Sequence, residues 1–458
     1  MVHTLLALAA GLFACGKPEA DNDPRPIVRE RPVEAIRALA ARDDLNLLFV
    51  VVDTLRADRL GLYGYPRPTS PTLDYLGLSG GIVFRNHHAQ SSWTKCSMAS
   101  LWTARYPVHS GVLRAQDGIP SDARLPAEIL RDSGFRTVGL WRNGWVSPSF
   151  GFGQGFESYS RPRASPVPRT VRRENPTALS VGTDVDLVLG AFTFLRIYGQ
   201  ERWFLYLHWM DLHEYLYDAD SARFGSTYSD VYDNSILRVN LVLEKLIGHL
   251  AAEGYLENTV VVITSDHGEA FGEHGSEGHA RNVYSEVTHV PLVVALPFRL
   301  GSPLLIDSRT ENVDIWPTLF DLLGLPAMQD VDGVSALPLI EASLSRERRE
   351  PSARSSFSYL DQTWGRMSAP SRPLLAVSDG SLRLYHRSWS PEHDELYDLA
   401  RDPGEQRDLR ADRPDETARL RAIAAGHLQG KPAWGTAPQL ELDEMELNNL
   451  RALGYKLP

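Results

Sequence analysis

Five continuous apolar runs constrain the fold of this 458-residue chain more than any other feature of its sequence. A continuous apolar run is typical of a strand buried on both faces of a parallel sheet, because a strand with one wet face alternates apolar and polar residues. Several of the runs follow stretches with helical periodicity, and this alternation predicts an α/β fold with a mostly parallel sheet. The expected strands lie at 45–53, 135–143, 202–211, 258–269 and 289–297.

Polar residues end four of these runs. Asp53 ends the first run, Asn143 the second and Asp211 the third, and Asp266 with His267 follows the fourth. In open α/β sheets, ligands bind at the carboxyl ends of the strands. The sequence therefore predicts that these side chains converge on one site.

The chain after residue 340 is expected to form a linker and a smaller α+β subdomain, residues 341–458. The stretch "EASLSRERREPSARSS" is charged, as linkers often are. Asp379-Gly380 separates two short strand-like runs, which is a hairpin signal, and a helix is expected near 413–428. Residues 45–340 then form the larger α/β domain.

The first 15 residues predict an export signal rather than a part of the fold. Their apolar run is short for a membrane span and ends in a lipobox-like Leu-Phe-Ala-Cys at Cys15. Lipidation there would anchor the protein in the periplasm or cell envelope, and an ordinary cleaved signal is the alternative. Residues 16–44 begin polar and Pro-rich and predict a tether that leads into a short helix. With Cys15 lipidated, Cys96 has no partner, which excludes a disulfide framework.

The formal net charge of −11 excludes a general nucleic-acid or anionic-membrane binder, because such surfaces require a basic face. We expect membrane contact only through the lipid anchor. An anionic substrate must then be captured locally, by a metal or a few cationic side chains.

The segment "TSDHGEAFGEHG" is the strongest candidate for chemistry. Asp266 and His267 stand at the end of an apolar strand, and a carboxylate beside an imidazole suits a divalent metal. Asp53, at the end of the first strand, is a second candidate ligand. Each residue alone is more often a turn former or a surface side chain.

Several segments in fixed order resemble the sulfatase family of the alkaline phosphatase superfamily. The resemblance implies an alkaline-phosphatase-like α/β/α sandwich, a smaller C-terminal domain and a metal-dependent ester hydrolase. Its segments are "NLLFVVVDTLRADRLGLYGY", "SPTLDYLGLSGGIVFRNHHAQSSWT", "LWTARYPVHSGV", "LYLHWMDLHE", "VVVITSDHGEAFGEHG", "VDIWPTLFDLLGLP", "ELYDLARDPGEQRDL" and the terminal "LGY".

The register of the resemblance selects Thr94 as the nucleophile. In the family pattern Cys-x-Pro-Ser-Arg, the cysteine becomes formylglycine and stands nine residues before the threonine of a Thr-Gly-x-Tyr-Pro-like segment. Here that segment begins at Thr103, and nine residues earlier is Thr94. Cys96 falls on the proline position and Met98 on the arginine position. If Cys96 is instead aligned with the family cysteine, the arginine position holds Ser100, so neither register completes the formylglycine signal.

A threonine at this position is chemically competent. Binding to a metal lowers the pKa of a hydroxyl, and the start of a helix favours an anion. A plain N-cap role for Thr94 is the alternative. Related phosphoethanolamine and glycerophosphate transferases use threonine at the equivalent place. A threonine sulfate cannot be released by collapse to an aldehyde, so this residue shifts the expectation towards phosphate or phosphonate esters.

The resemblance implies a metal set of Asp53, Thr94, Asp266 and His267. The single imidazole among oxygen ligands favours zinc or manganese, with calcium, common in sulfatases, as the alternative.

Other family positions supply further site candidates. His213 matches the histidine of the family's Pro-His segment and is a candidate general acid for the leaving group. His279 stands where many sulfatases have lysine and is a candidate contact of the transferred group, as donor or acid. Asn143 and His274 are weaker candidates for substrate binding. We expect His208, inside an apolar strand, to be structural.

The function expected from these residues is hydrolysis of sulfate or phosphate-type esters of a small molecule, glycan or lipid, with Thr94 attacking in line. Two alternatives remain open. One is a phospho-group transferase, and the other is a sulfatase-fold binding protein without catalysis. One sequence does not identify the substrate, because specificity in such folds depends on loops.

Overall fold

The computed structural model describes residues 23–176, 182–345, 354–366 and 368–441. The predicted signal, with Cys15, lies outside these residues, as do parts of the predicted linker and the terminal "LGY". None of the described helices combines the length and apolarity that crossing a membrane requires.

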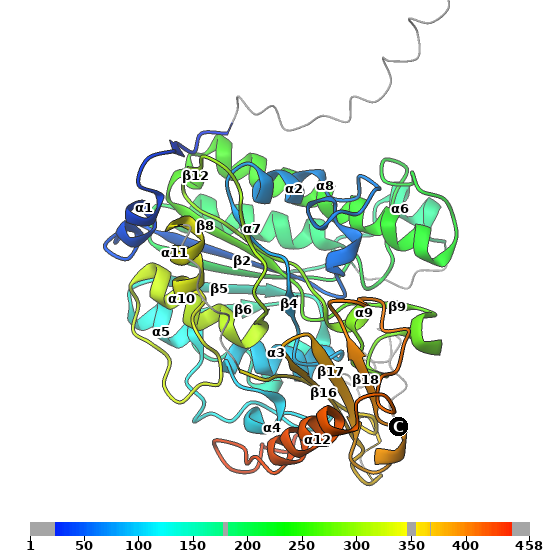
Figure 1. Ribbon diagram of the computed structural model, residues 1–458. Helices are drawn as coiled ribbons and strands as arrows, with labels where there is room; N and C mark the ends of the chain where they lie inside the picture. Colours follow the sequence, from blue (N-terminus) through cyan, green and yellow to red (C-terminus); the bar gives the residue numbers. More distant parts are fainter. Residues whose placement is uncertain (1–22, 177–181, 346–353, 367, 442–458) are drawn as a thin grey trace, which may run out of the picture.

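An eight-stranded sheet forms the centre of the larger domain (Figure 1). Seven strands run parallel, and β11 alone runs antiparallel to its two neighbours, β3 and β8. The mostly parallel sheet expected from the apolar runs is therefore confirmed. In spatial order the strands are β13 (Leu304–Ile306), β3 (Ile82–Phe84), β11 (Leu292–Ala295), β8 (Thr259–Thr264), β2 (Asn46–Val52), β7 (Trp203–Trp209), β5 (Arg136–Trp141) and β6 (Ser158–Ser160).

Helices cover both faces of this sheet, because each central strand is apolar on both sides. On β2, Phe49 packs into one core and its neighbour Val50 into the other. The Val50 face is covered by α2 (Pro71–Leu78), α7 (Asp184–Tyr198) and α8 (Tyr228–Ala252). The Phe49 face is covered by α1 (Pro32–Leu39), α3 (Thr94–Thr103), α4 (Pro107–Ser110), α5 (Pro126–Asp132), α10 (Ile315–Leu323) and α11 (Leu337–Ser345).

An aromatic cluster packs α3 and α10 against the sheet. Trp102 of α3 lies 5.2 Å from Trp316 of α10 between ring centroids, and Phe49 of β2 lies 5.0 Å from Trp316. All three rings are buried. Burying a side chain of this size contributes about 2 to 3 kcal/mol, so the cluster holds the C-terminal end of α3 firmly against the sheet.

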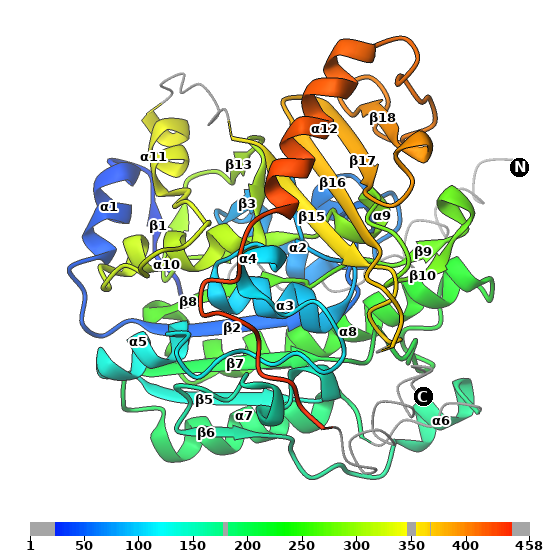
Figure 2. The same cartoon turned by 90° about the horizontal axis from the view of Figure 1, so that it is seen from below.

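A four-stranded antiparallel sheet with one helix forms the smaller C-terminal domain, beside α3 and α4 (Figure 2). The strands β16 and β17 form the hairpin predicted at Asp379-Gly380. Apolar residues of this sheet join the same core as the Phe49 face, so the two domains share one hydrophobic interior. The elements are β15 (Ser356–Asp361), β16 (Pro373–Asp379), β17 (Leu382–Arg387), β18 (Glu395–Asp398) and α12 (Pro414–Leu428).

Two domain boundaries differ from the sequence-based expectation. The predicted tether packs on the large domain from Asp23 onwards: β1 (Ile27–Val28) pairs in parallel with β12 (Arg299–Leu300), and α1 buries two apolar side chains. The helix α11 crosses the expected boundary at residue 340 and packs on α1, α10 and β13. The helix α1 is the short helix expected at the end of the tether, and a few buried apolar residues are enough to dock such an element on the large domain.

Candidate active site

Two strand ends and one helix start build the candidate site. Asp53 follows β2, Asp266 and His267 follow the neighbouring β8, and Thr94 is the first residue of α3. All four residues are buried. The convergence expected from the carboxyl ends of parallel strands is observed for Asp53, Asp266 and His267, and Asn143 joins them through Asp53. The prediction was wrong for Asp211, which pairs with Arg142 and Arg238 instead.

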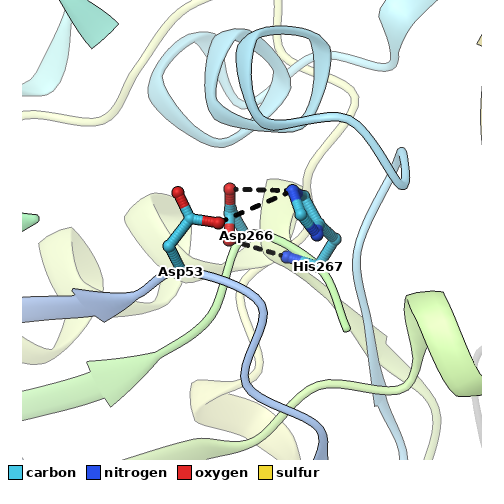
Figure 3. A group of neighbouring side chains, drawn as sticks. All are labelled: Asp53, Asp266 and His267. Atoms are coloured by element: carbon cyan, nitrogen blue, oxygen red, sulfur yellow. Dashed lines mark hydrogen bonds and ion pairs between the residues drawn. The ribbon is translucent and has the colours of Figure 1, made fainter. Parts of the chain in front are cut away.

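Two carboxylate oxygens and one imidazole nitrogen face a common point (Figure 3). Nε2 of His267 lies 3.3 Å from Oδ2 of Asp266 and 3.8 Å from Oδ1 of Asp53. These two oxygens are buried and accept no hydrogen bond from a described residue. Buried carboxylate oxygens are costly to leave unpaired, so their arrangement around a ring nitrogen fits a divalent cation.

Backbone contacts orient each candidate ligand. The other oxygen of Asp266, Oδ1, accepts the backbone N–H groups of His267 at 2.9 Å and Thr54 at 3.3 Å. Nδ1 of His267 lies 3.0 Å from the carbonyl oxygen of Gly268, so this nitrogen is the donor and Nε2 carries the lone pair. The side chains therefore present their free lone pairs to the same point.

The turn after Asp53 adopts a strained backbone. Thr54 has a φ of 65°, which is uncommon for a β-branched residue. Its carbonyl accepts a hydrogen bond from the Tyr232 hydroxyl at 2.6 Å, and its N–H binds Asp266. Strain of this kind costs about 1 to 3 kcal/mol and concentrates at functional sites.

Thr94 lies at the edge of this cluster. Its Oγ1 is 3.1 Å from Nε2 of His267 and accepts a longer hydrogen bond, 3.4 Å, from Nδ2 of Asn143. The same amide donates to Oδ2 of Asp53 at 2.6 Å. The hydroxyl thus stands between a helix N-terminus, an amide donor and the candidate metal ligands.

Cys96 lies in a different environment although it is only two residues away. Its side chain belongs to the hydrophobic core on the Phe49 face. Burial raises the pKa of this thiol to about 12, so it stays protonated near neutral pH. The cysteine side chain packs in the core, whereas Thr94 contacts His267.

The pKa values of the two aspartates are shifted in opposite directions. Burial alone raises the pKa of Asp53, but His213, His208 and His267 outweigh it and hold the pKa well below its usual range. Burial and the neighbouring Asp53 carboxylate raise the pKa of Asp266. Two carboxylates this close repel one another, which again suits a shared cation.

Two further predicted residues stand beside the cluster. The ring of His279 stacks on His267 with centroids 4.6 Å apart, and the ring of His213 lies 5.0 Å from His279. Burial lowers the pKa of His213 to about 4. Burial lowers the pKa of His279 as well, but the carboxylate of Glu269, 3.1 Å from its Nδ1, outweighs this and leaves the pKa above its usual range.

The structure places His274 away from the cluster. Its Nδ1 lies 3.0 Å from Glu286, its Nε2 lies 3.1 Å from the carbonyl of Glu405, and its ring stacks on Tyr284 at 3.9 Å. Since Glu405 follows the small sheet, His274 joins the two domains.

Sequence reasoning missed two contacts at the site. Nε2 of His208, a residue expected to be structural, donates to Oδ2 of Asp53 at 3.2 Å, and its Nδ1 accepts from the Tyr206 hydroxyl at 2.7 Å. Glu269, two residues after His267, pairs with His279. The position of His208 at the end of the third apolar run, next to the polar strand ends, was the available signal.

Comparisons with known proteins find similarity over most of this chain. The sulfatase family profile matches residues 45–325, and a profile of the C-terminal region of N-sulphoglucosamine sulphohydrolase matches residues 272–423. Arylsulfatase A of Homo sapiens is 25% identical over 444 residues, covering 81% of this chain and 84% of the relative. The delta 4,5-hexuronate-2-O-sulfatase of Bacteroides thetaiotaomicron is 23% identical over 440 residues, covering 82% and 86%.

A solved structure shows the same fold. The phosphonate monoester hydrolase of Agrobacterium radiobacter superposes with a TM-score of 0.66 at 19% identity, covering 88% of this chain and 98% of that chain. The sulfatase profile spans more than half of the sequence, including both strand ends and the start of α3. The chain therefore belongs to the sulfatase family of the alkaline phosphatase superfamily and is an ester-hydrolysing enzyme.

Proposed function

We propose that this enzyme hydrolyses sulfate or phosphate-type esters with the Thr94 hydroxyl as nucleophile and a divalent metal at the strand ends. One observation carries the proposal: Oγ1 of Thr94, 3.1 Å from Nε2 of His267, adjoins two buried carboxylate oxygens that have no hydrogen-bond partner among the described residues. The formylglycine-forming cysteine of the family has no counterpart in this register.

Asp53, Asp266 and His267 would hold the metal, with Thr94 beside them. A divalent cation there supplies positive charge that lowers the pKa of the hydroxyl and neutralises the transferred group. The imidazole in the set favours zinc or manganese over calcium.

In the first chemical step, the reacting group is transferred from the substrate to Thr94. Thr94, its proton lost to solvent, attacks sulfur or phosphorus, and the bond to the leaving-group oxygen breaks. That oxygen takes a proton from His279, whose Nδ1 is held by Glu269. The helix start and the Asn143 amide stabilise negative charge at Thr94 before the attack.

The second step releases the enzyme. Water attacks the sulfur or phosphorus of the Thr94 ester, the bond to Oγ1 breaks, and the water proton passes to His279, now neutral. His213 is buried with a lowered pKa, so it acts as a neutral hydrogen-bonding partner rather than as a second acid.

Export belongs to the same proposal. The first 22 residues lie outside the described part of the chain, and the case for a lipid anchor at Cys15 and a location in the cell envelope rests on the lipobox-like sequence alone. Incorporation of a radiolabelled fatty acid in the wild type, absent in Cys15→Ala, is the expected result. Equal labelling of both proteins would contradict it.

The test of the function is turnover of aryl sulfate, phosphate monoester, phosphate diester and methylphosphonate substrates, each with zinc, manganese or calcium. We expect at least one ester class to be hydrolysed in a metal-dependent way. Products formed only when an alcohol acceptor is added would indicate a transferase. Binding without turnover for every pair of substrate and metal would indicate a binding protein and overturn the proposal.

A further inference from the structure

A cleft of about 490 Å³ opens beside the catalytic histidines. His213 and His279 line it on the side of the metal cluster. The other lining residues come from both domains: the segment 278–281 and Tyr215 with Tyr228 belong to the large domain, and residues 362–366 form the loop after β15. A leaving group attached to the reacting ester would occupy this space.

The loop from the small domain is held in place before any substrate arrives. Oδ1 of Asp361 accepts the backbone N–H of Thr363 at 2.8 Å and of Arg372 at 3.0 Å. The ring of Trp364 stacks on Trp93, the residue before Thr94, with centroids 4.4 Å apart. Its Nε1 donates to the carbonyl of Ala280 at 3.3 Å. The loop is therefore anchored to both the nucleophile segment and the opposite rim of the cleft.

The cleft offers rings for stacking. The hydroxyls of Tyr215 and Tyr228 bind one another at 2.6 Å, which fixes these two side chains in the lining. Trp364 adds a third aromatic surface from the other domain. Three aromatic side chains in the lining suit a flat or cyclic group.

The charge of the lining is positive although the chain carries a net charge of −11. Arg281 and Arg366 are exposed lining residues, and neither forms an ion pair with a described side chain. Glu269 is the only carboxylate among the described lining residues, and its charge is shared with His279. Two arginine side chains without acidic partners at one cleft favour an anion.

We propose that Arg281 and Arg366 are specificity-determining residues that select a cyclic leaving group bearing a second anionic group, such as a carboxylate. The inference rests on the proposed function, because it places the ester at Thr94 and the leaving group in the cleft. The inference concerns the substrate, which neither the fold nor the candidate metal ligands identify. The substrate would carry two negative groups: the ester that reacts at Thr94 and a second anion that the two arginines bind.

The test compares two esters that differ only in this second charge. One substrate is the sulfate or phosphate-type ester formed at the phenol oxygen of 4-hydroxybenzoate, which keeps the free carboxylate. The other is the same ester of methyl 4-hydroxybenzoate, in which the carboxylate is blocked. Both are made in the ester class that the enzyme hydrolyses best. The measured quantity is the ratio of kcat/KM for the carboxylate to kcat/KM for its methyl ester. Since exposed charge pairs are worth little individually, we expect this ratio to fall about threefold in Arg281→Gln or Arg366→Gln and about tenfold in the double variant.

Matched controls separate recognition from stability and from general charge. Arg29→Gln with Arg196→Gln removes two exposed arginines outside the cleft and should leave the ratio unchanged. Raising the salt concentration should lower the wild-type ratio towards that of the cleft double variant, because screening weakens exposed charges. An equal ratio in the wild type and the cleft variants would overturn the inference. Turnover of both esters in the same experiment would still support the proposed function.

Failure of the proposed function gives a different result. If neither ester is hydrolysed, binding of free 4-hydroxybenzoate and of its methyl ester is measured by ligand-observed NMR. Tighter binding of the carboxylate, lost in the cleft double variant, would support the inference without catalysis. Equal binding of both compounds would overturn it.

Discussion

Two groups of acids and histidines differ in how completely their polar atoms are hydrogen-bonded. In the strand-end group, Asp53 and Asp266 each keep one oxygen without a hydrogen-bond partner among the described residues. In the interdomain group, His274 bonds to Glu286 and to the Glu405 carbonyl, and its ring stacks on an aromatic neighbour. The difference teaches that residue type alone does not identify a site. Buried polar atoms that converge without hydrogen-bond partners indicate a ligand-binding site. Polar atoms that all have protein partners indicate a structural role.

The largest effect should follow from changing a candidate metal ligand. Asp266→Asn keeps Oδ1 for its backbone donors but weakens the metal-binding oxygen, so we expect kcat/KM to fall by about 10³-fold or more. The variant should unfold at the same or a higher temperature than the metal-free wild type, because a buried charge beside Asp53 is removed. Steady-state kinetics and calorimetry after chelation measure both. A clear loss of stability with activity kept would place Asp266 in the structural class.

Chelation tests the same group without mutation. Removing the metal should abolish most turnover and lower the thermal midpoint, since a ligand bound only to the folded state stabilises it. Adding back zinc, manganese or calcium separately should restore activity with one preferred ion. Full activity after exhaustive dialysis, with no metal found by elemental analysis, would contradict the assignment.

The interdomain group should respond in the opposite way. His274→Gln should lower the free energy of unfolding by about 1 to 3 kcal/mol, because it leaves buried partners unpaired, while kcat/KM stays near the wild-type value. Denaturant unfolding and steady-state kinetics measure these quantities. A loss of activity with an unchanged free energy of unfolding would indicate that His274 takes part in substrate binding after all.

The interdomain group should also make the free energy of unfolding depend on pH. Burial lowers the pKa of His274, but Glu286 outweighs it and raises the pKa from 6.5 to about 9. The pair therefore stabilises the fold in full below pH 6.5, and this contribution is lost as the pH rises through 9. We expect the decline in unfolding free energy over this window to be smaller in His274→Gln. Identical pH profiles would rule the pair out as a source of stability.

The smallest effect is expected at the cysteine. Cys96→Ala removes a buried sulfur from the core and should lower the free energy of unfolding by about 1 kcal/mol, with activity retained. Thermal unfolding and turnover measure it. Complete inactivation by this change would show that the nucleophile register is wrong.

Local patterns predicted the centre of the fold well. Continuous apolar runs located β2, β5, β7 and β8, because strands buried on both faces have no polar alternation. The short strand β13 and the docked strand β1 carry too few residues for such a signal. Each of these strands pairs with a strand far away in the sequence, and a local sequence pattern carries no information about such a partner.

The candidate site divides in the same way. Asp53, Asp266 and His267 could be predicted because strand ends meet at one edge of the sheet. Trp364 could not, since it reaches Trp93 from the small domain across 271 positions of the chain. Glu269 was overlooked because its role appears only when His279, ten residues later, folds back onto it.

The measurement that tests the central claim most directly is turnover combined with intact mass after rapid acid quench, for wild type, Thr94→Ala, Thr94→Ser and Cys96→Ala. We predict that activity falls by about 10³-fold or more only in Thr94→Ala, is partly kept in Thr94→Ser, and is retained in Cys96→Ala. The quenched wild type should carry the transferred group on the peptide that contains Thr94. Activity lost only in Cys96→Ala, with a formyl group at that position in the wild type, would contradict the account.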